Sequence, residues 1–185
     1  NTLDEDVHNV PESERYSVIL TNPPFGGEEE KRIGENYPVK TSATEAMALQ
    51  YIIRHLKNGG RCGVVLPEGD VVSGSGAMAR IRQELLEKCS VHSIISLPRG
   101  VFTEMGAGVK TNLIFFDKTG STKEIWYGEI VGKFTKKKNI QDEHLEDVFE
   151  LWEKRKVSVA CSPFFRHLVY SLTDTGLVVN CCRSA

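Results

Sequence analysis

The chain has 185 residues, of which 40% are hydrophobic and 26% are charged, and this balance predicts one soluble domain able to bury a core of its own. The same balance excludes a disordered or fibrous protein. No apolar run approaches the roughly 20 residues needed to cross a bilayer, and the polar first residues lack the features of a signal peptide. We therefore expect a cytoplasmic protein with no membrane partner.

Cysteine and histidine are spaced too irregularly to predict a metal site or a disulfide framework. The five cysteines are an odd number and include no Cys-x-x-Cys pair, and no pair of histidines has metal-ligand spacing. We expect reduced cysteines and no bound metal. Cys62 and Cys89 lie in or beside apolar segments and should be small core residues.

The charge balance excludes a protein that grips nucleic acid through a large basic surplus. The 23 basic and 25 acidic residues leave a formal net charge of −2, whereas an autonomous DNA-binding protein usually carries an excess of lysine and arginine. If the chain acts on DNA, much of the grip must come from another subunit or from sequence outside this chain.

The first predicted element is a strand over Tyr16 to Thr21, a short run rich in β-branched residues that ends at two prolines, as is typical of a buried parallel strand. A polar, glycine-containing loop follows it. A helix should then begin at the capping-box pattern Ser42-Ala43-Thr44-Glu45, in which Ser42 bonds the amide of Glu45 and the Glu45 carboxylate reaches back. Asn58-Gly59-Gly60 supplies the stop of this helix.

The remaining elements alternate strand and helix and then close with two consecutive strands. Lys118-Thr119-Gly120-Ser121, between those two strands, indicates a hairpin-like turn. The last predicted helix has an apolar face made of Leu145, Val148, Phe149 and Trp152. We expect strands at Cys62–Leu66, Val91–Leu97, Thr111–Asp117 and Glu124–Ile130, and helices at about Ala77–Lys88 and Gln141–Lys156.

This order of elements predicts an α/β fold with a mostly parallel sheet that carries an antiparallel strand near one edge. A doubly wound sheet normally opens with a strand, a glycine-rich cofactor turn and a helix, and no such turn precedes Tyr16. We therefore expect half of such a fold, with the N-terminal cofactor-binding half missing.

The tetrapeptide Asn22-Pro23-Pro24-Phe25 directly follows the first strand and carries the strongest chemical signal in the chain. The exocyclic amine of adenine is a weak nucleophile because its nitrogen lone pair is delocalised into the ring. Two acceptors, the side-chain oxygen of Asn22 and the backbone carbonyl of Pro23, can bind the two amine hydrogens and direct the lone pair at an incoming methyl group.

The prolines and the phenylalanine of this motif suit the same task. Each proline fixes φ at about −65° and has no N–H that would compete for the edge of the base. Phe25 supplies an aromatic face on which a base taken out of a duplex can stack, which returns about 1–3 kcal/mol. The alternative interpretation is a strand terminator followed by a surface phenylalanine.

Asn22-Pro23-Pro24-Phe25-Gly26 resembles the catalytic motif of the N6-adenine DNA methyltransferases. The sequence from about Asn1 to Trp152 resembles the modification subunit of type I restriction-modification systems. The resemblance implies a Rossmann-like methyltransferase sheet, in which residues 1–135 form the C-terminal half of the catalytic domain and residues 136–185 form a helical extension and a tail without an assigned function. Three more segments follow in that family's order, namely Ile81-Arg82-Gln83-Glu84-Leu85-Leu86, Leu97-Pro98-Arg99-Gly100-Val101-Phe102 and Gly108-Val109-Lys110-Thr111-Asn112-Leu113-Ile114-Phe115-Phe116.

The resemblance also implies a cofactor and partners. The methyl donor of the family is S-adenosylmethionine, bound by a glycine-rich loop and an acidic residue that are both missing from this chain. Asn1 falls on a position that contacts the adenine ring of the cofactor. Phe102 falls on a second aromatic contact to the flipped base, for which a core or loop phenylalanine is the alternative. DNA, a specificity subunit and a restriction subunit are the implied partners.

The predicted function is therefore transfer of a methyl group from S-adenosylmethionine to N6 of adenine in DNA, with Asn22, Pro23, Pro24 and Phe25 as the catalytic residues. Two alternatives stay open. Related Asn-Pro-Pro-aromatic enzymes methylate protein glutamine side chains or RNA bases. A chain without the cofactor-binding residues is also compatible with a catalytically silent structural or assembly module.

Overall fold

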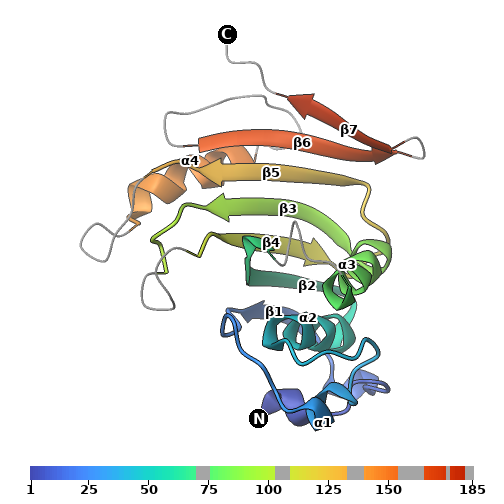
Figure 1. Cartoon of the computed structure of the whole chain (residues 1–185). Coiled ribbons are helices and arrows are strands. Elements are labelled where there is room, and N and C mark those ends of the chain that lie inside the picture. The colour runs from blue at the N-terminus through green and yellow to red at the C-terminus, as the bar shows by residue number, and fades with distance from the viewer. Residues whose placement is uncertain (70–75, 103–108, 133–139, 154–164, 174–175, 182–185) are drawn as a thin grey trace.

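A computed structural model of the chain describes residues 1–69, 76–102, 109–132, 140–153, 165–173 and 176–181, the last two ranges by their backbone alone. Within these ranges the strands form one seven-stranded sheet in the order β1-β2-β4-β3-β5-β6-β7 (Figure 1). The strands are β1 (Tyr16–Thr21), β2 (Leu56–Pro67), β3 (Ser90–Leu97), β4 (Thr111–Asp117), β5 (Glu124–Ile130), β6 (Phe165–Thr173) and β7 (Gly176–Cys181).

The helices are α1 (Lys31–Gly34), α2 (Thr44–His55), α3 (Ala77–Lys88) and α4 (Asp142–Glu153), with short 3-10 turns η1 (Thr2–Asp4) and η2 (Glu12–Glu14) before β1. The helices α2 and α3 cover one face of the sheet and α4 packs on the other, whereas the short α1 packs beside α2 (Figure 1). In the described part of the chain, none of them combines the length and apolar character that a membrane-spanning helix needs.

The directions of the strands confirm the predicted mixed sheet. β1 pairs with β2 in parallel, and β3 pairs with β5 in parallel. β4 is antiparallel to both β2 and β3 and lies between them. β1, β2, β3 and β5 therefore point the same way, and their carboxyl ends meet at one edge of the sheet. Residues 136–185, the predicted helical extension and tail, also contribute β6 and β7, which pair in antiparallel fashion beyond β5.

The predicted hairpin-like turn at residues 118–121 is wrong, because β5 does not return alongside β4. Pairing with β2 continues past the end of β4: the amide of Lys118 donates to the carbonyl of Gly60 at 2.9 Å, and the amide of Gly59 donates to Lys118 at 2.8 Å. The hydroxyl of Thr122 then accepts from the Val91 amide at 2.9 Å and donates to Cys89 at 2.7 Å. These bonds hold the connection beside the start of β3, and β5 then pairs with β3.

The helix predicted after the motif loop ends earlier than its glycine pair indicated. α2 stops at His55 because Leu56 is already extended and pairs with Tyr16 of β1. Gly59 and Gly60 lie inside β2, where Gly59 has a φ of +78°, a conformation that favours glycine. Strand pairing with β1 thus overrides the local stop signal.

β1 is a parallel strand, as predicted, but it is an edge strand rather than a buried one within the described residues. The alternating side chains of Tyr16, Val18 and Leu20 are 55%, 51% and 76% exposed. Ile19, which points to the other face, packs against the core below α2 and α3. One face of the strand is therefore partly buried, and the other presents apolar surface.

The main core lies between the sheet and the pair α2 and α3. Its members include Cys62 and Cys89, which are 4% and 0% exposed, as the sequence predicted for small core residues. Burial raises the pKa of Cys62 to about 12 and that of Cys89 to about 11. The largest fully buried side chains of this core are Leu49, Ile53, Leu56, Leu66, Ile81 and Phe116.

A second core lies on the opposite face, where α4 packs against β3 and β5. Trp152 anchors the helix, because its ring NH donates to the hydroxyl of Ser93 at 2.7 Å and its ring lies 5.6 Å from that of Phe115. Val148 is buried, but Phe149 is 60% exposed. The prediction that Phe149 shares the packed face is wrong, since the sheet covers only a narrow stripe of the helix.

Phe116→Ala should lower the free energy of unfolding by about 3–5 kcal/mol, because the ring is fully buried and the neighbouring strands cannot close the cavity. Phe149→Ala removes the same atoms from an exposed position and should cost less than about 1 kcal/mol. Urea denaturation followed by circular dichroism measures both values. Equal losses would contradict the assignment of Phe116 to the core.

Cys62 and Cys89 should resist alkylation by iodoacetamide at pH 8 until the protein unfolds. The raised pKa leaves about a hundredfold less thiolate at Cys89, and about a thousandfold less at Cys62, than an ordinary thiol has at this pH, and burial excludes the reagent as well. Peptide mass spectrometry after native and urea-unfolded labelling measures the two rates. Similar rates in both states would show that these thiols are accessible.

Candidate active site

The sheet presents Asn22 at the edge where the parallel strands end. Asn22 follows β1 directly, one residue after Thr21, which pairs with Val64 of β2. The side chain is exposed and borders a hollow of about 370 Å³ whose other walls are mainly apolar side chains of β1, β2 and β4. Ligands of open α/β sheets bind at this edge, so the position suits a reacting group.

The loop after Asn22 is bound to the start of α2. The Gly26 amide donates to the carboxylate of Glu45, and the Thr44 amide donates to the Gly27 carbonyl at 3.0 Å. The amide of Glu29 donates to the Ser42 carbonyl at 2.8 Å. Three hydrogen bonds therefore fix a segment that has no regular structure of its own.

The predicted capping box at this helix is wrong. α2 begins at Thr44 after Ala43, and no side chain caps it. The Glu45 carboxylate bonds Gly26 of the motif loop instead of reaching back to Ser42. The motif loop competes with Ser42 for the first amides of the helix and for the Glu45 carboxylate. The Gly27 carbonyl accepts from the Thr44 amide, and the Gly26 amide, which has no partner within its own loop, donates to Glu45.

Two glycines let the loop approach the helix so closely. Gly26 has a φ of +69°, which L-residues rarely adopt. A Cβ on Gly27 would lie 2.5 Å from the hydroxyl oxygen of Thr44. A side chain at either position would therefore strain the loop or push it off α2.

The remaining motif residues differ in burial. Pro23 is buried, Pro24 is exposed and Phe25 is partly buried. The rings of Phe25 and Phe102 lie 6.1 Å apart at an interplanar angle of 84°, which is an edge-to-face contact. Phe102 also packs against the core under α4. The structure thus brings together two aromatic residues that are 77 positions apart in the sequence.

Asn1 lies beside the same loop. Its side-chain oxygen accepts from the Leu3 amide at 3.2 Å and caps η1, and its side-chain NH₂ donates to the Glu29 carboxylate at 3.0 Å. These contacts place Asn1 against the far end of the loop that begins at Asn22. Its predicted contact with a cofactor stays a prediction.

Sequence reasoning missed a charged triad at this edge of the sheet. Lys110, just before β4, lies 3.0 Å from the Glu68 carboxylate after β2 and 3.2 Å from that of Glu129 in β5. Burial alone would lower the pKa of Lys110, but its hydrogen bonds to both carboxylates outweigh that effect and raise the pKa. The triad ties three strand ends together. Asp70, a second acidic residue in the same loop as Glu68, lies outside the described residues.

Glu45→Gln should speed hydrogen exchange of the Gly26 amide by about tenfold, because a neutral amide oxygen is a weaker acceptor than a carboxylate. Glu28→Gln is the matched control, since Glu28 belongs to the same loop and its side chain is exposed. Two-dimensional NMR after transfer to D₂O measures the exchange rate. An unchanged Gly26 rate in Glu45→Gln would show that the carboxylate does not hold the loop.

Known proteins are similar to this chain in sequence and in fold. The chain is 39% identical over 159 residues to the EcoEI type I restriction enzyme methylase subunit of Escherichia coli, a match that covers 82% of this chain and 32% of that protein. A solved structure described as a modification subunit of a type I restriction enzyme, from Vibrio vulnificus YJ016, is 35% identical with a TM-score of 0.81. That match covers 100% of this chain and 41% of the other.

A third relative agrees with these two. The EcoKI M protein structure is 32% identical with a TM-score of 0.70, over 82% of this chain and 33% of that one. The chain thus spans about a third of the length of the curated relatives it matches. The predicted resemblance to type I modification subunits is confirmed. Since the profile of the family described as N-6 DNA Methylase also matches residues 1–174, the chain belongs to that family.

Proposed function

We propose that this chain holds the target adenine of a DNA methyltransferase and orients its N6 amine for methylation. The observation that carries the proposal is the position of Asn22-Pro23-Pro24-Phe25 at the end of β1, in a loop that Glu45 fastens to α2. Membership of the N-6 DNA methylase family and the names of the relatives support it.

Asn22 and Pro23 supply the two acceptors. The Asn22 side-chain oxygen accepts one N6 hydrogen and the Pro23 carbonyl accepts the other. These two bonds reduce the delocalisation of the nitrogen lone pair into the ring and direct it at the incoming methyl group. Pro23 is buried and has no amide hydrogen, so its carbonyl is held by a rigid backbone. The loop therefore holds both acceptors in position before the base binds.

Phe25 and Phe102 supply stacking surface for the extruded base. Their edge-to-face contact supports a shared role, because the two rings already meet at the edge of the sheet. Since the rings are nearly perpendicular, a base stacks on the face of one ring and meets the edge of the other. Stacking of this kind returns about 1–3 kcal/mol of the cost of extrusion.

S-adenosylmethionine is the methyl donor in this proposal, and it supplies an electrophilic methyl group when bound. The described residues do not make a complete pocket for it, because the hollow beside Asn22 has no carboxylate in its wall for the ribose hydroxyls. Asn1 is the one predicted cofactor contact in the chain. Most of the donor site would therefore come from outside the described residues.

The exposed apolar side chains of β1 support the proposal that residues 1–135 are one half of a larger catalytic domain. Tyr16, Val18 and Leu20 present apolar side chains there, and further strands with their covering helices would bury them. Residues 1–135 then form the C-terminal half of a catalytic domain, with residues 136–185 as its extension. The extension contains α4 and also β6 and β7, which continue the sheet.

The proposed setting is a cytoplasmic type I complex with DNA, a specificity subunit and a restriction subunit. Relatives are named as methylase subunits of type I restriction enzymes. The formal net charge of −2 supports this division of labour, because a subunit that holds one base can leave most phosphate contacts to a partner.

Asn22→Ala should lower the rate of methyl transfer to adenine by about 10²-fold or more, because the amine loses one of its two preorganised acceptors. The assay uses the full-length subunit with its specificity partner, labelled S-adenosylmethionine and duplex DNA. Gln83→Ala removes an exposed side-chain amide on α3 and should leave the rate unchanged.

The assay also separates the proposed function from its alternatives. Label in N6-methyladenine that disappears in Asn22→Ala supports the proposal. Full activity of Asn22→Ala would remove Asn22 from the mechanism. Label found in protein glutamine or RNA, and none in DNA, would overturn the choice of substrate.

A further inference from the structure

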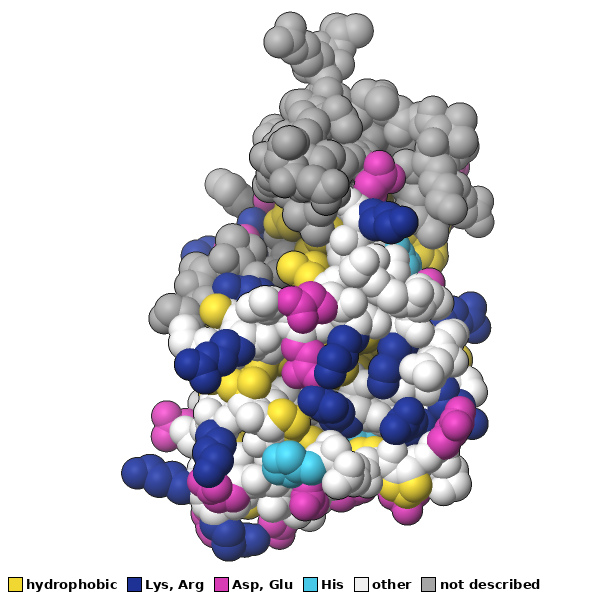
Figure 2. All heavy atoms as spheres, turned by 90° about the vertical axis from the view of Figure 1, so that its right-hand side faces the viewer, with side chains coloured by type: hydrophobic (Ala, Val, Ile, Leu, Met, Phe, Trp, Pro, Cys, Tyr) yellow, Lys and Arg dark blue, Asp and Glu magenta, His cyan; other side chains and the backbone are white. Residues whose placement is uncertain are grey.

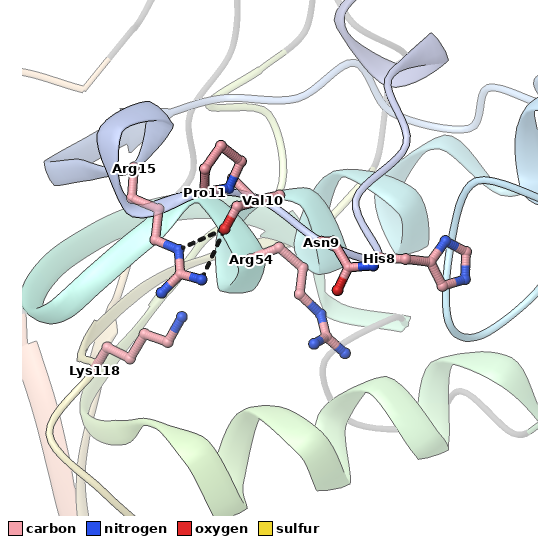
Figure 3. A pocket seen from close by; sticks show the side chains of 7 residues that line it. All are labelled: His8, Asn9, Val10, Pro11, Arg15, Arg54 and Lys118. Carbon is pink, nitrogen blue, oxygen red and sulfur yellow. Dashed lines mark hydrogen bonds between the residues drawn. The ribbon is translucent and has the colours of Figure 1, made fainter.

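A basic hollow lies at the edge of the sheet opposite to the motif loop, where β1 and β5 begin and β4 ends. It measures about 470 Å³, and Arg15, Arg54 and Lys118 are among the residues that line it (Figure 3). A second hollow of about 580 Å³ shares Lys118 and adds Lys88. Lysine and arginine side chains gather over the middle of this side of the molecule, with fewer carboxylates among them (Figure 2).

Arg15 and Lys118 are held by neutral groups. The Arg15 guanidinium donates twice to the Val10 carbonyl, from Nε at 3.2 Å and from Nη2 at 2.8 Å. The Lys118 ammonium donates to the carbonyls of Ile53 at 2.6 Å and Leu56 at 2.9 Å. Within the part of the chain that the structure describes, neither cation has a carboxylate within 4.0 Å.

The other two cations share a single carboxylate. Arg54 and Lys88 both lie 2.7 Å from the same oxygen of Glu84 on α3. In Figure 3 the Arg54 side chain points away from Arg15, whereas the Lys118 ammonium points toward the Arg15 guanidinium. The ion pairs of the described residues thus provide one carboxylate for four cations.

Lys118 shows the effect of this imbalance. Burial lowers its pKa, and the nearby positive charges of Arg15, Arg54 and Lys88 lower it further. Four fixed cations that repel one another beside an open hollow are an arrangement that an anion stabilises.

We propose that this hollow binds a phosphate group through Arg15 and Lys118. A guanidinium has five N–H donors and an ammonium has three, so after two bonds each to carbonyls Arg15 keeps three donors and Lys118 keeps one. A tetrahedral oxyanion can accept from both at once, and guanidinium groups favour such acceptors. Free phosphate and the phosphodiester backbone of nucleic acid present the same chemistry.

The phosphate site is separate from the proposed methylation site. Arg15 precedes β1 and Asn22 follows it, so the strand lies between them. A phosphate bound at Arg15 does not occupy the loop that would hold the base. The two proposals can therefore fail independently.

Isothermal titration of the full chain with inorganic phosphate, at ionic strength held constant with sodium chloride, tests the site. Arg15→Gln is the primary variant, because Lys118 also binds the carbonyls that end α2. The dissociation constant should rise at least tenfold in Arg15→Gln and in Lys118→Gln. Lys123→Gln removes an exposed cation that lines neither hollow and should change it less than twofold. Circular dichroism and thermal melting establish that each variant is folded.

Competition identifies the source of the phosphate. Displacement by duplex DNA in the wild type, lost in Arg15→Gln, would assign the site to a nucleic acid backbone. Displacement by pyrophosphate and not by DNA would assign it to free phosphate compounds. No saturable binding to the wild type, or equal affinity in Arg15→Gln and Lys123→Gln, would overturn the proposal.

Discussion

The motif loop depends on its attachment to the first turn of α2. Residues 22–30 contain no helix or strand of their own beyond one isolated bridge, so their conformation comes from bonds to a neighbour. Glu45 provides the central bond, since its carboxylate accepts the Gly26 amide and is buried while doing so. Removing that acceptor would leave a backbone donor without a partner and the acceptors of Asn22 and Pro23 without a fixed direction.

The rigid sheet makes this attachment effective. β1 is paired with β2, and α2 runs directly into β2, so the start of the loop and the helix that holds it belong to one unit. The aromatic partner Phe102 comes from the segment after β3, which is fixed through the core under α4. Elements distant in the sequence thus define one site because the parallel strands end at the same edge.

The two edges of the sheet have different chemistry. The carboxyl edge carries the motif loop, the aromatic pair and the triad in which Lys110 lies between the carboxylates of Glu68 and Glu129. The opposite edge carries Arg15 and Lys118, which are bound only by backbone carbonyls among the described residues. A net charge near zero therefore conceals a local excess of positive charge, which composition alone cannot reveal.

The sequence alone determined the α/β class and the places of strands β1 to β5, because these depend on local propensity and on hydrophobic patterns along the chain. The chemistry proposed for Asn22-Pro23-Pro24-Phe25 likewise comes from residues adjacent in the chain. Only the tertiary structure decided which strands pair and which residues the motif loop contacts. Strand pairing placed β4 between β2 and β3 and ended α2 at His55, earlier than predicted. The Glu45 carboxylate binds the Gly26 amide of the motif loop instead of capping α2. These outcomes depend on competition between groups far apart in the sequence, whose balance no local pattern records.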